Sequence, residues 1–212
     1  MTEIRILAGD ALFLRDGAVT PVETLTERET IEFAELGPLE AFVTSGGTST
    51  VPYSFEGRLQ VYENKTLRYP GHLPAFRAYK ELGLFSAAAI DVDGSRVSPR
   101  AVYHALLGPK LAAQVVEDVC VMRAIGRGRR GADELELVLD LVDRYDPVTG
   151  FSAMERLTGW HAAIMAGFVA DGAVPPGVCP VERAVAAAPI LDRIRQRGIA
   201  IEERWSARQL GA

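Results

Sequence analysis

The chain has 212 residues and a net charge of −5, a balance that argues against a nucleic-acid-binding surface, because such surfaces need clustered Lys and Arg. Its two cysteines are too few for a disulfide framework or a four-ligand zinc site. The sequence has no run of about 18 apolar residues, the length that a helix needs to cross a bilayer. We therefore expect a cytoplasmic protein that binds no nucleic acid, no membrane and no metal, built as one large domain or a domain with an appendage.

Short strands are predicted in the first third of the chain. Asp16-Gly17 separates two apolar segments, 11–15 and 18–22, and is a strong signal for a two-residue hairpin turn. Further strands are predicted over 30–33, 39–44 and 58–67.

Two helices should follow this region. Pro70-Gly71 ends the last strand, and a helix is predicted over 72–82, closed by Gly83. Asp93-Gly94 predicts a small hairpin, and Ser98-Pro99 predicts the start of a second helix that runs to about residue 107.

The clearest hairpin lies in the second half of the chain. Leucines at every second position from 135 to 141 predict a half-buried strand that pairs with 115–125 across a loop at 126–133. Helices are predicted over 152–170 and, interrupted near Pro189, over 180–197.

The order of these elements indicates the fold class. It lacks the strict strand–helix alternation of a doubly wound parallel sheet. We predict an α+β fold with a largely antiparallel or mixed sheet, helices on one face and no complete Rossmann domain. Residues 1–150 should form an α+β domain, and residues 151–212 a helical segment.

One glycine pattern mimics a nucleotide site. Residues 126–131 (G-R-G-R-R-G) match G-x-G-x-x-G, but the dinucleotide fingerprint requires a helix directly after the glycines, and a strand is predicted there instead. We therefore expect this chain to bind no cofactor by itself.

Two other segments are candidate ligand sites. In the first, Gly46 and Gly47 permit close backbone approach, and Thr48 and Ser49 add hydroxyls that can hold an anion. In the second, Arg68 stands at a strand end and could present its planar fork to a carboxylate. An ordinary polar loop and a surface Arg at a strand–turn–helix junction are the alternatives.

These segments together resemble the C-terminal domain of the saccharopine dehydrogenase and lysine 6-dehydrogenase family. The resemblance covers nearly the whole chain and is carried by residues 39–42 (L-E-A-F), 46–50 (G-G-T-S-T), 63–72 (E-N-K-T-L-R-Y-P-G-H), 140–146 (D-L-V-D-R-Y-D) and 154–160 (M-E-R-L-T-G-W).

The resemblance implies one half of a two-domain enzyme. A Rossmann domain, supplied in cis or in trans, would hold NAD or NADP. The second domain, shaped like the C-terminal domain of glyceraldehyde-3-phosphate dehydrogenase, would close over the substrate, and its sheet often makes a homodimer interface. The chemistry would be hydride transfer at a carbon that bears nitrogen, in lysine metabolism or related polyamine synthesis.

The resemblance also implies site residues. Arg68 would bind a substrate carboxylate, Tyr69 and His72 would shape the pocket, and Gly47, Thr48 and Ser49 would line its other wall. Saccharopine reductases carry an Asn-Arg-Asp-Ser type sequence where this chain has residues 47–50. The loss of that Arg suits a smaller amino acid, such as lysine, better than saccharopine.

The missing half has two further implications. We expect this chain alone to be inactive, and we expect an apolar stripe on the helix over 152–170 to pack partly against the Rossmann domain; its members are Leu157, Trp160, Ile164 and Phe168. The alternative is a non-catalytic module for amino-acid binding or dimerisation that has lost its cofactor domain.

Overall fold

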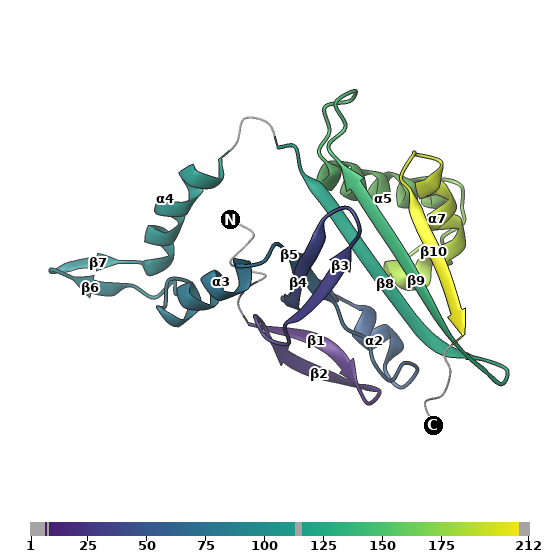
Figure 1. The fold of residues 1–212 in the computed structure, drawn as a ribbon, viewed down its shortest axis with the longest axis horizontal. Coiled ribbons are helices and arrows are strands. Elements are labelled where there is room, and N and C mark those ends of the chain that lie inside the picture. Colours follow the sequence, from purple (N-terminus) through teal and green to yellow (C-terminus); the bar gives the residue numbers. More distant parts are fainter. Residues whose placement is uncertain (1–6, 8, 113–115, 208–212) are drawn as a thin grey trace. The chain divides into compact units, whose positions relative to one another are not determined.

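The computed structural model describes residue 7, residues 9–112 and residues 116–207 (Figure 1). The chain divides by its internal contacts into two compact units, Met1–Ala112 and Ala113–Ala212. The functional division predicted at residue 150 stays a prediction.

The described strands of the first unit form three antiparallel sheets. Its elements are β1 (Asp10–Arg15), β2 (Ala18–Glu23), β3 (Glu29–Phe33), β4 (Gly37–Val43), α2 (Val51–Phe55), β5 (Lys65–Arg68), α3 (His72–Glu81), β6 (Ile90–Val92), β7 (Ser95–Val97) and α4 (Pro99–Leu111). β1 pairs with β2, β6 pairs with β7, and a three-stranded sheet has the order β3-β4-β5. Both predicted Asp-Gly turns form, with left-handed backbone at both residues of each: φ is 50° and 81° at Asp16-Gly17 and 49° and 79° at Asp93-Gly94.

The core of the first unit lies on both faces of β4. Residues 39–43 are all buried, because successive side chains point to opposite faces and both faces are covered. On one face Phe42 packs against α3; this cluster contains Leu7, Leu25, Phe42, Leu73, Phe76, Phe85 and Tyr103. On the other face Val43 packs against Ala11 and Phe13 of β1.

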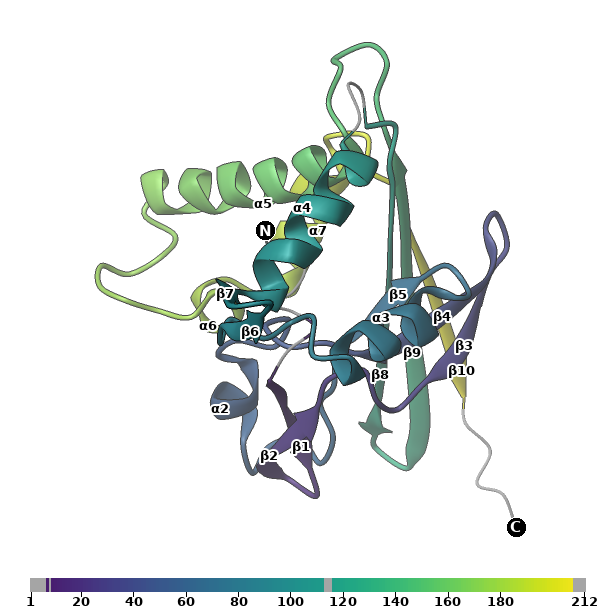
Figure 2. The ribbon, with the colours of Figure 1, turned by 90° about the vertical axis from the view of Figure 1, so that its left-hand side faces the viewer.

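The second unit is a three-stranded antiparallel sheet with helices on one face. Its elements are β8 (Val119–Arg130), β9 (Asp133–Arg144), α5 (Ala153–Ala170), α6 (Val181–Ala184), α7 (Ala187–Arg195) and β10 (Ile201–Ala207). The strand order is β10-β9-β8, and α5 and α7 lie on the same side of this sheet in Figure 2. Ion pairs bind each helix to the sheet: Arg156 of α5 with Asp143 at 3.0 Å, and Arg195 of α7 with Glu203 at 3.4 Å.

The predicted fold class is confirmed: the fold is α+β, and the strand pairs are antiparallel, with no Rossmann-like parallel sheet in the described parts of the chain. Several element bounds were wrong. β8 continues through Arg130, so residues 126–130 are strand rather than loop. β5 covers only the end of the strand predicted over 58–67, and α2 and β10 were not predicted.

The stripe predicted on α5 is partly buried within this unit. Ile164 and Phe168 are 3% and 8% exposed, whereas Trp160 is 38% exposed, so a contact of the stripe with a further domain stays a prediction. α5 packs against α7, β8 and β9, and the Arg193 guanidinium lies 5.5 Å from the centre of the Phe168 ring. An amphipathic helix buries its stripe against the nearest apolar surface, which the sheet and α7 provide.

Of the helices in residues 9–112 and 116–207, none is both long and apolar enough to cross a membrane.

Candidate functional site

The centre of the candidate site is Arg68, the last residue of β5. The antiparallel register places Arg68 opposite Glu40 and Thr66 opposite Phe42, all on one face of the sheet. The Arg68 side chain is partly buried, and its Nη1 donates a hydrogen bond to the carbonyl oxygen of Leu67 at 2.9 Å. Within the described residues this is the only hydrogen bond of the guanidinium, so most of its N–H donors stay available to a ligand.

His72 lies on the same face of the sheet as Arg68. It is the first residue of α3, placed there by a turn in which Gly71 has a φ of 96°, a value that glycine adopts without strain. Its ring stacks on Phe76 with 4.1 Å between ring centres, and Phe42 lies 6.2 Å away. The structure therefore brings Arg68 and His72 to one side of β4 and β5, whereas Tyr69, between them in sequence, is 59% exposed.

The glycine-rich segment after β4 folds against the start of β5. The hydroxyls of Thr44 and Thr66 are 2.5 Å apart, and the Asn64 amide donates to the Gly47 carbonyl at 3.3 Å. A Cβ on Gly47 would lie 3.1 Å from the Asn64 side chain, so a larger residue there would need Asn64 to shift. The carbonyl of Thr48, a buried residue, accepts from the Val51 N–H at 3.0 Å in the turn that leads into α2.

The two predicted walls of the site are separated along β5. Asn64 contacts Gly47, and Asn64 precedes Arg68 by four residues, or roughly 13 Å of extended chain. No hydrogen bond joins Arg68 to Gly47, Thr48 or Ser49 in the part of the chain that is described. The two walls are thus at opposite ends of one short strand, and of the predicted site residues Arg68 and His72 share a face of the sheet.

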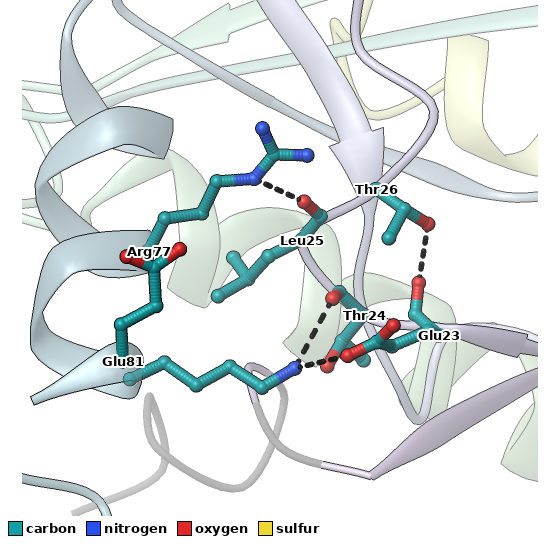
Figure 3. A pocket seen from close by; sticks show the side chains of 7 residues that line it. Glu23, Thr24, Leu25, Thr26, Arg77 and Glu81 are labelled. Atoms are coloured by element: carbon teal, nitrogen blue, oxygen red, sulfur yellow. Dashed lines mark hydrogen bonds and ion pairs between the residues drawn. The ribbon is translucent and has the colours of Figure 1, made fainter. Parts of the chain in front are cut away.

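A separate cavity of about 390 Å³ lies against the second half of α3 (Figure 3). Its lining residues are Glu23, Thr24, Leu25, Thr26, Arg77, Lys80 and Glu81. Lys80 donates to Glu23 at 2.9 Å and thereby lowers the pKa of that carboxyl, and Arg77 donates through Nε to the Leu25 carbonyl at 2.7 Å. None of the predicted site residues lines this cavity. We place the candidate site at Arg68, because the cavity is open and its Lys80 is already neutralised.

The G-x-G-x-x-G pattern does not fit a dinucleotide. Gly126 and Gly128 lie within β8, and cross-strand ion pairs bind that segment to β9: Arg127 with Glu136 at 2.6 Å, and Arg129 with Glu134 at 3.0 Å. The chain then turns into β9 rather than into a helix whose N-terminus could meet a pyrophosphate. Among the residues described, no group of three His, Cys, Asp or Glu side chains could hold a metal ion.

Sequence reasoning missed Glu40 as a residue of this site. Glu40 is 4% exposed and lies in the middle of β4, directly across from Arg68. The signal was present, because a single acidic residue within an apolar strand is expected only where it is paired. Its observed partner is Arg28, and its position opposite Arg68 could not be identified without the register.

The comparison with protein families agrees with these observations. A family model described as the saccharopine dehydrogenase C-terminal domain matches residues 3–199. The match spans nearly the whole chain and includes every residue of the candidate site.

Proposed function

We propose, because the chain belongs to the saccharopine dehydrogenase C-terminal domain family, that it is the substrate-binding half of an NAD(P)-dependent amino-acid dehydrogenase. The observation that supports this proposal is Arg68, a partly buried guanidinium with unused donors on the same face of the sheet as His72. A planar guanidinium binds a carboxylate through two parallel hydrogen bonds, which fixes the ligand's orientation as well as its position.

The proposed substrate is an amino acid of the size of lysine, or its imine. One carboxylate would bind Arg68, and the apolar chain would lie along the partly buried ring of His72. Residues 47–49 offer hydroxyls and backbone groups but no cation, which favours a ligand without a second carboxylate at that end.

The cofactor is proposed to bind to a partner Rossmann domain, in cis or in trans, because the G-x-G-x-x-G segment at 126–131 leads into a strand rather than a helix. Residues 151–212 remain the proposed contact for that domain, through the outward side of α5, where Met154 and Val169 are 61% and 59% exposed. A homodimer is proposed as well. This chain alone should not turn over substrate.

Calorimetry with L-lysine tests the binding role. Arg68→Ala should weaken lysine binding by about 10- to 100-fold, the loss expected for a hydrogen-bonded charge pair. Arg96→Ala is the matched control, because Arg96 is an exposed Arg in β7 of the same unit and should leave affinity unchanged. Binding that survives Arg68→Ala intact would remove this residue from the site.

Reconstitution tests the catalytic role. The chain is mixed with a separately expressed Rossmann domain of the family, lysine and NAD or NADP, and formation of the reduced nicotinamide is followed by its absorbance. Turnover only in the complete mixture is expected. Lysine binding without turnover in every mixture would instead favour a non-catalytic amino-acid-binding module.

A further inference from the structure

Glu40 carries a buried carboxylate oxygen without a hydrogen-bond donor. Its side chain is 5% exposed, and its Oε1 accepts from Arg28 through Nε at 3.0 Å and Nη2 at 2.9 Å. Its Oε2 is fully buried and accepts no hydrogen bond. Buried carboxylate oxygens are nearly always paired, so this oxygen indicates a donor that arrives in another state of the protein.

The nearest candidate for that donor is Arg68. Glu40 and Arg68 are directly opposite in the β4–β5 ladder, where facing residues have Cβ atoms about 5 Å apart and point to the same face. Arg68 uses only Nη1, for the Leu67 carbonyl, and no ion pair joins it to Glu40 in this structure. An unused acceptor and an underused donor therefore lie on neighbouring strands.

We propose that Glu40 is a positioning residue for Arg68. With ligand bound, one edge of the guanidinium donates to Oε2 of Glu40 and another edge donates to the ligand carboxylate. The inference rests on the proposed role of Arg68 in carboxylate binding. The planar fork of Arg has donors on more than one edge, so it can serve both carboxylates at once.

Charge balance supports this arrangement. Arg28 and Glu40 form a neutral pair, so Arg68 alone adds one positive charge to a partly desolvated face. A ligand carboxylate completes an alternating row of Arg28, Glu40, Arg68 and ligand. Each buried charge in such a row faces an opposite charge on both sides, which offsets the cost of removing it from water.

A merely structural Glu40 makes a different prediction. If Glu40 serves only to hold Arg28, its substitution would lower the stability of the fold and leave the affinity of the folded protein for lysine unchanged. The coupling between Glu40 and Arg68 in ligand affinity therefore separates the two roles.

The test is a calorimetric double-mutant cycle with L-lysine as ligand and lysinamide, which lacks the carboxylate, as comparison. Glu40→Gln keeps the size of the side chain and removes its charge. We expect about tenfold weaker lysine binding in Glu40→Gln, no further loss when it is added to Arg68→Ala, and no effect on lysinamide. Lysine affinity that Glu40→Gln leaves unchanged, while Arg68→Ala loses it, overturns only this inference; unchanged affinity in Arg68→Ala overturns the proposed function.

A second measurement covers the case in which Glu40→Gln does not fold. A crystal structure of the unmodified chain with lysine should show an Arg68 nitrogen within hydrogen-bond distance of Oε2 of Glu40. A lysine carboxylate bound to Arg68 while Oε2 still has no donor would overturn the positioning role.

Discussion

Arg123 and Asp140 form a two-pronged ion pair between β8 and β9, with Nε 2.6 Å from Oδ1 and Nη2 2.8 Å from Oδ2. Arg204 of β10 donates to the same Oδ2 at 2.6 Å. Asp140 is therefore a single carboxylate that connects all three strands of the second unit, and it is 8% exposed.

Replacing this carboxylate should destabilise the second unit. Asp140→Asn removes the negative charge that two guanidinium groups share in a partly desolvated place, so we expect a loss of about 2 kcal/mol in the free energy of unfolding. Urea denaturation followed by circular dichroism measures it. Glu134→Gln is the matched control in the same hairpin, because the Arg129 side chain that it pairs with is 70% exposed, and such surface pairs contribute about 0–1 kcal/mol. Equal losses of unfolding free energy in the two variants would contradict the role of Asp140 in stabilising the sheet.

The same carboxylate should make stability depend on acidity. The hydrogen bond from Arg123 lowers the pKa of Asp140 below its ordinary value of 3.8. Because the folded-state pKa is the lower one, this stabilisation is complete above the unfolded pKa and is lost as the pH falls through the folded pKa. Urea midpoints measured from about pH 6 down to about pH 3 should fall more steeply for the unmodified protein than for Asp140→Asn. Parallel curves would be evidence against the pair as a source of stability.

Asp118 should stabilise the start of α5. Its carboxylate accepts from the backbone N–H groups of Ala153 at 2.6 Å and Met154 at 3.0 Å, beside the capping box made by Ser152 and Glu155. We expect Asp118→Ala to cost about 1 kcal/mol, because two N–H groups and the positive end of the helix dipole lose their partner. The adjacent Glu117→Ala is the control: Glu117 is exposed, and no interaction of its side chain is found in the described structure. The difference in urea midpoint between the two variants is the measurement.

Gly47 and Asn64 should show compensating effects. An added methyl group on Gly47 would lie 3.1 Å from the Asn64 side chain, so Gly47→Ala should cost about 1 kcal/mol through local crowding. Shortening the neighbour relieves that contact, and the double variant Gly47→Ala with Asn64→Ala should be less destabilised than the sum of the two single changes. Strictly additive losses in thermal unfolding would show that the two residues do not limit each other.

The sequence predicted the turns, caps and strands that depend on a few neighbouring residues. The two Asp-Gly turns, the Ser98 cap and the alternation of Leu135 to Leu141 each depend on a few neighbouring residues, and each was predicted correctly. Pro189 was expected to interrupt a helix, but it lies in the first turn of α7, where proline lacks only an N–H that needs no partner. The helical break falls before it, at Val185 and Ala186.

Strands that form only by pairing with residues far away in the sequence were missed. β10 forms because residues 201–207 meet β9 across about sixty residues of chain, and its own side chains are mostly exposed. Of the strand predicted over residues 58–67, the part before Lys65 is not a regular strand; there Tyr62 makes an isolated bridge to Leu14. In the candidate site, the strand-end position of Arg68 was predictable, whereas its neighbour Glu40 follows from the register of two strands.

The order β10-β9-β8 has a consequence for synthesis on the ribosome. β9 is the central strand, but one of its two neighbours is the last described element, so this sheet acquires its third strand only after residue 207 has left the exit tunnel. The three-stranded sheet of the first unit is made from segments that emerge within about forty residues of each other, from β3 to β5. We therefore expect the nascent chain to complete the β3-β4-β5 sheet early. Until β10 is added, α5 and α7 can pack only against the hairpin of β8 and β9, and a two-stranded hairpin is marginally stable by itself.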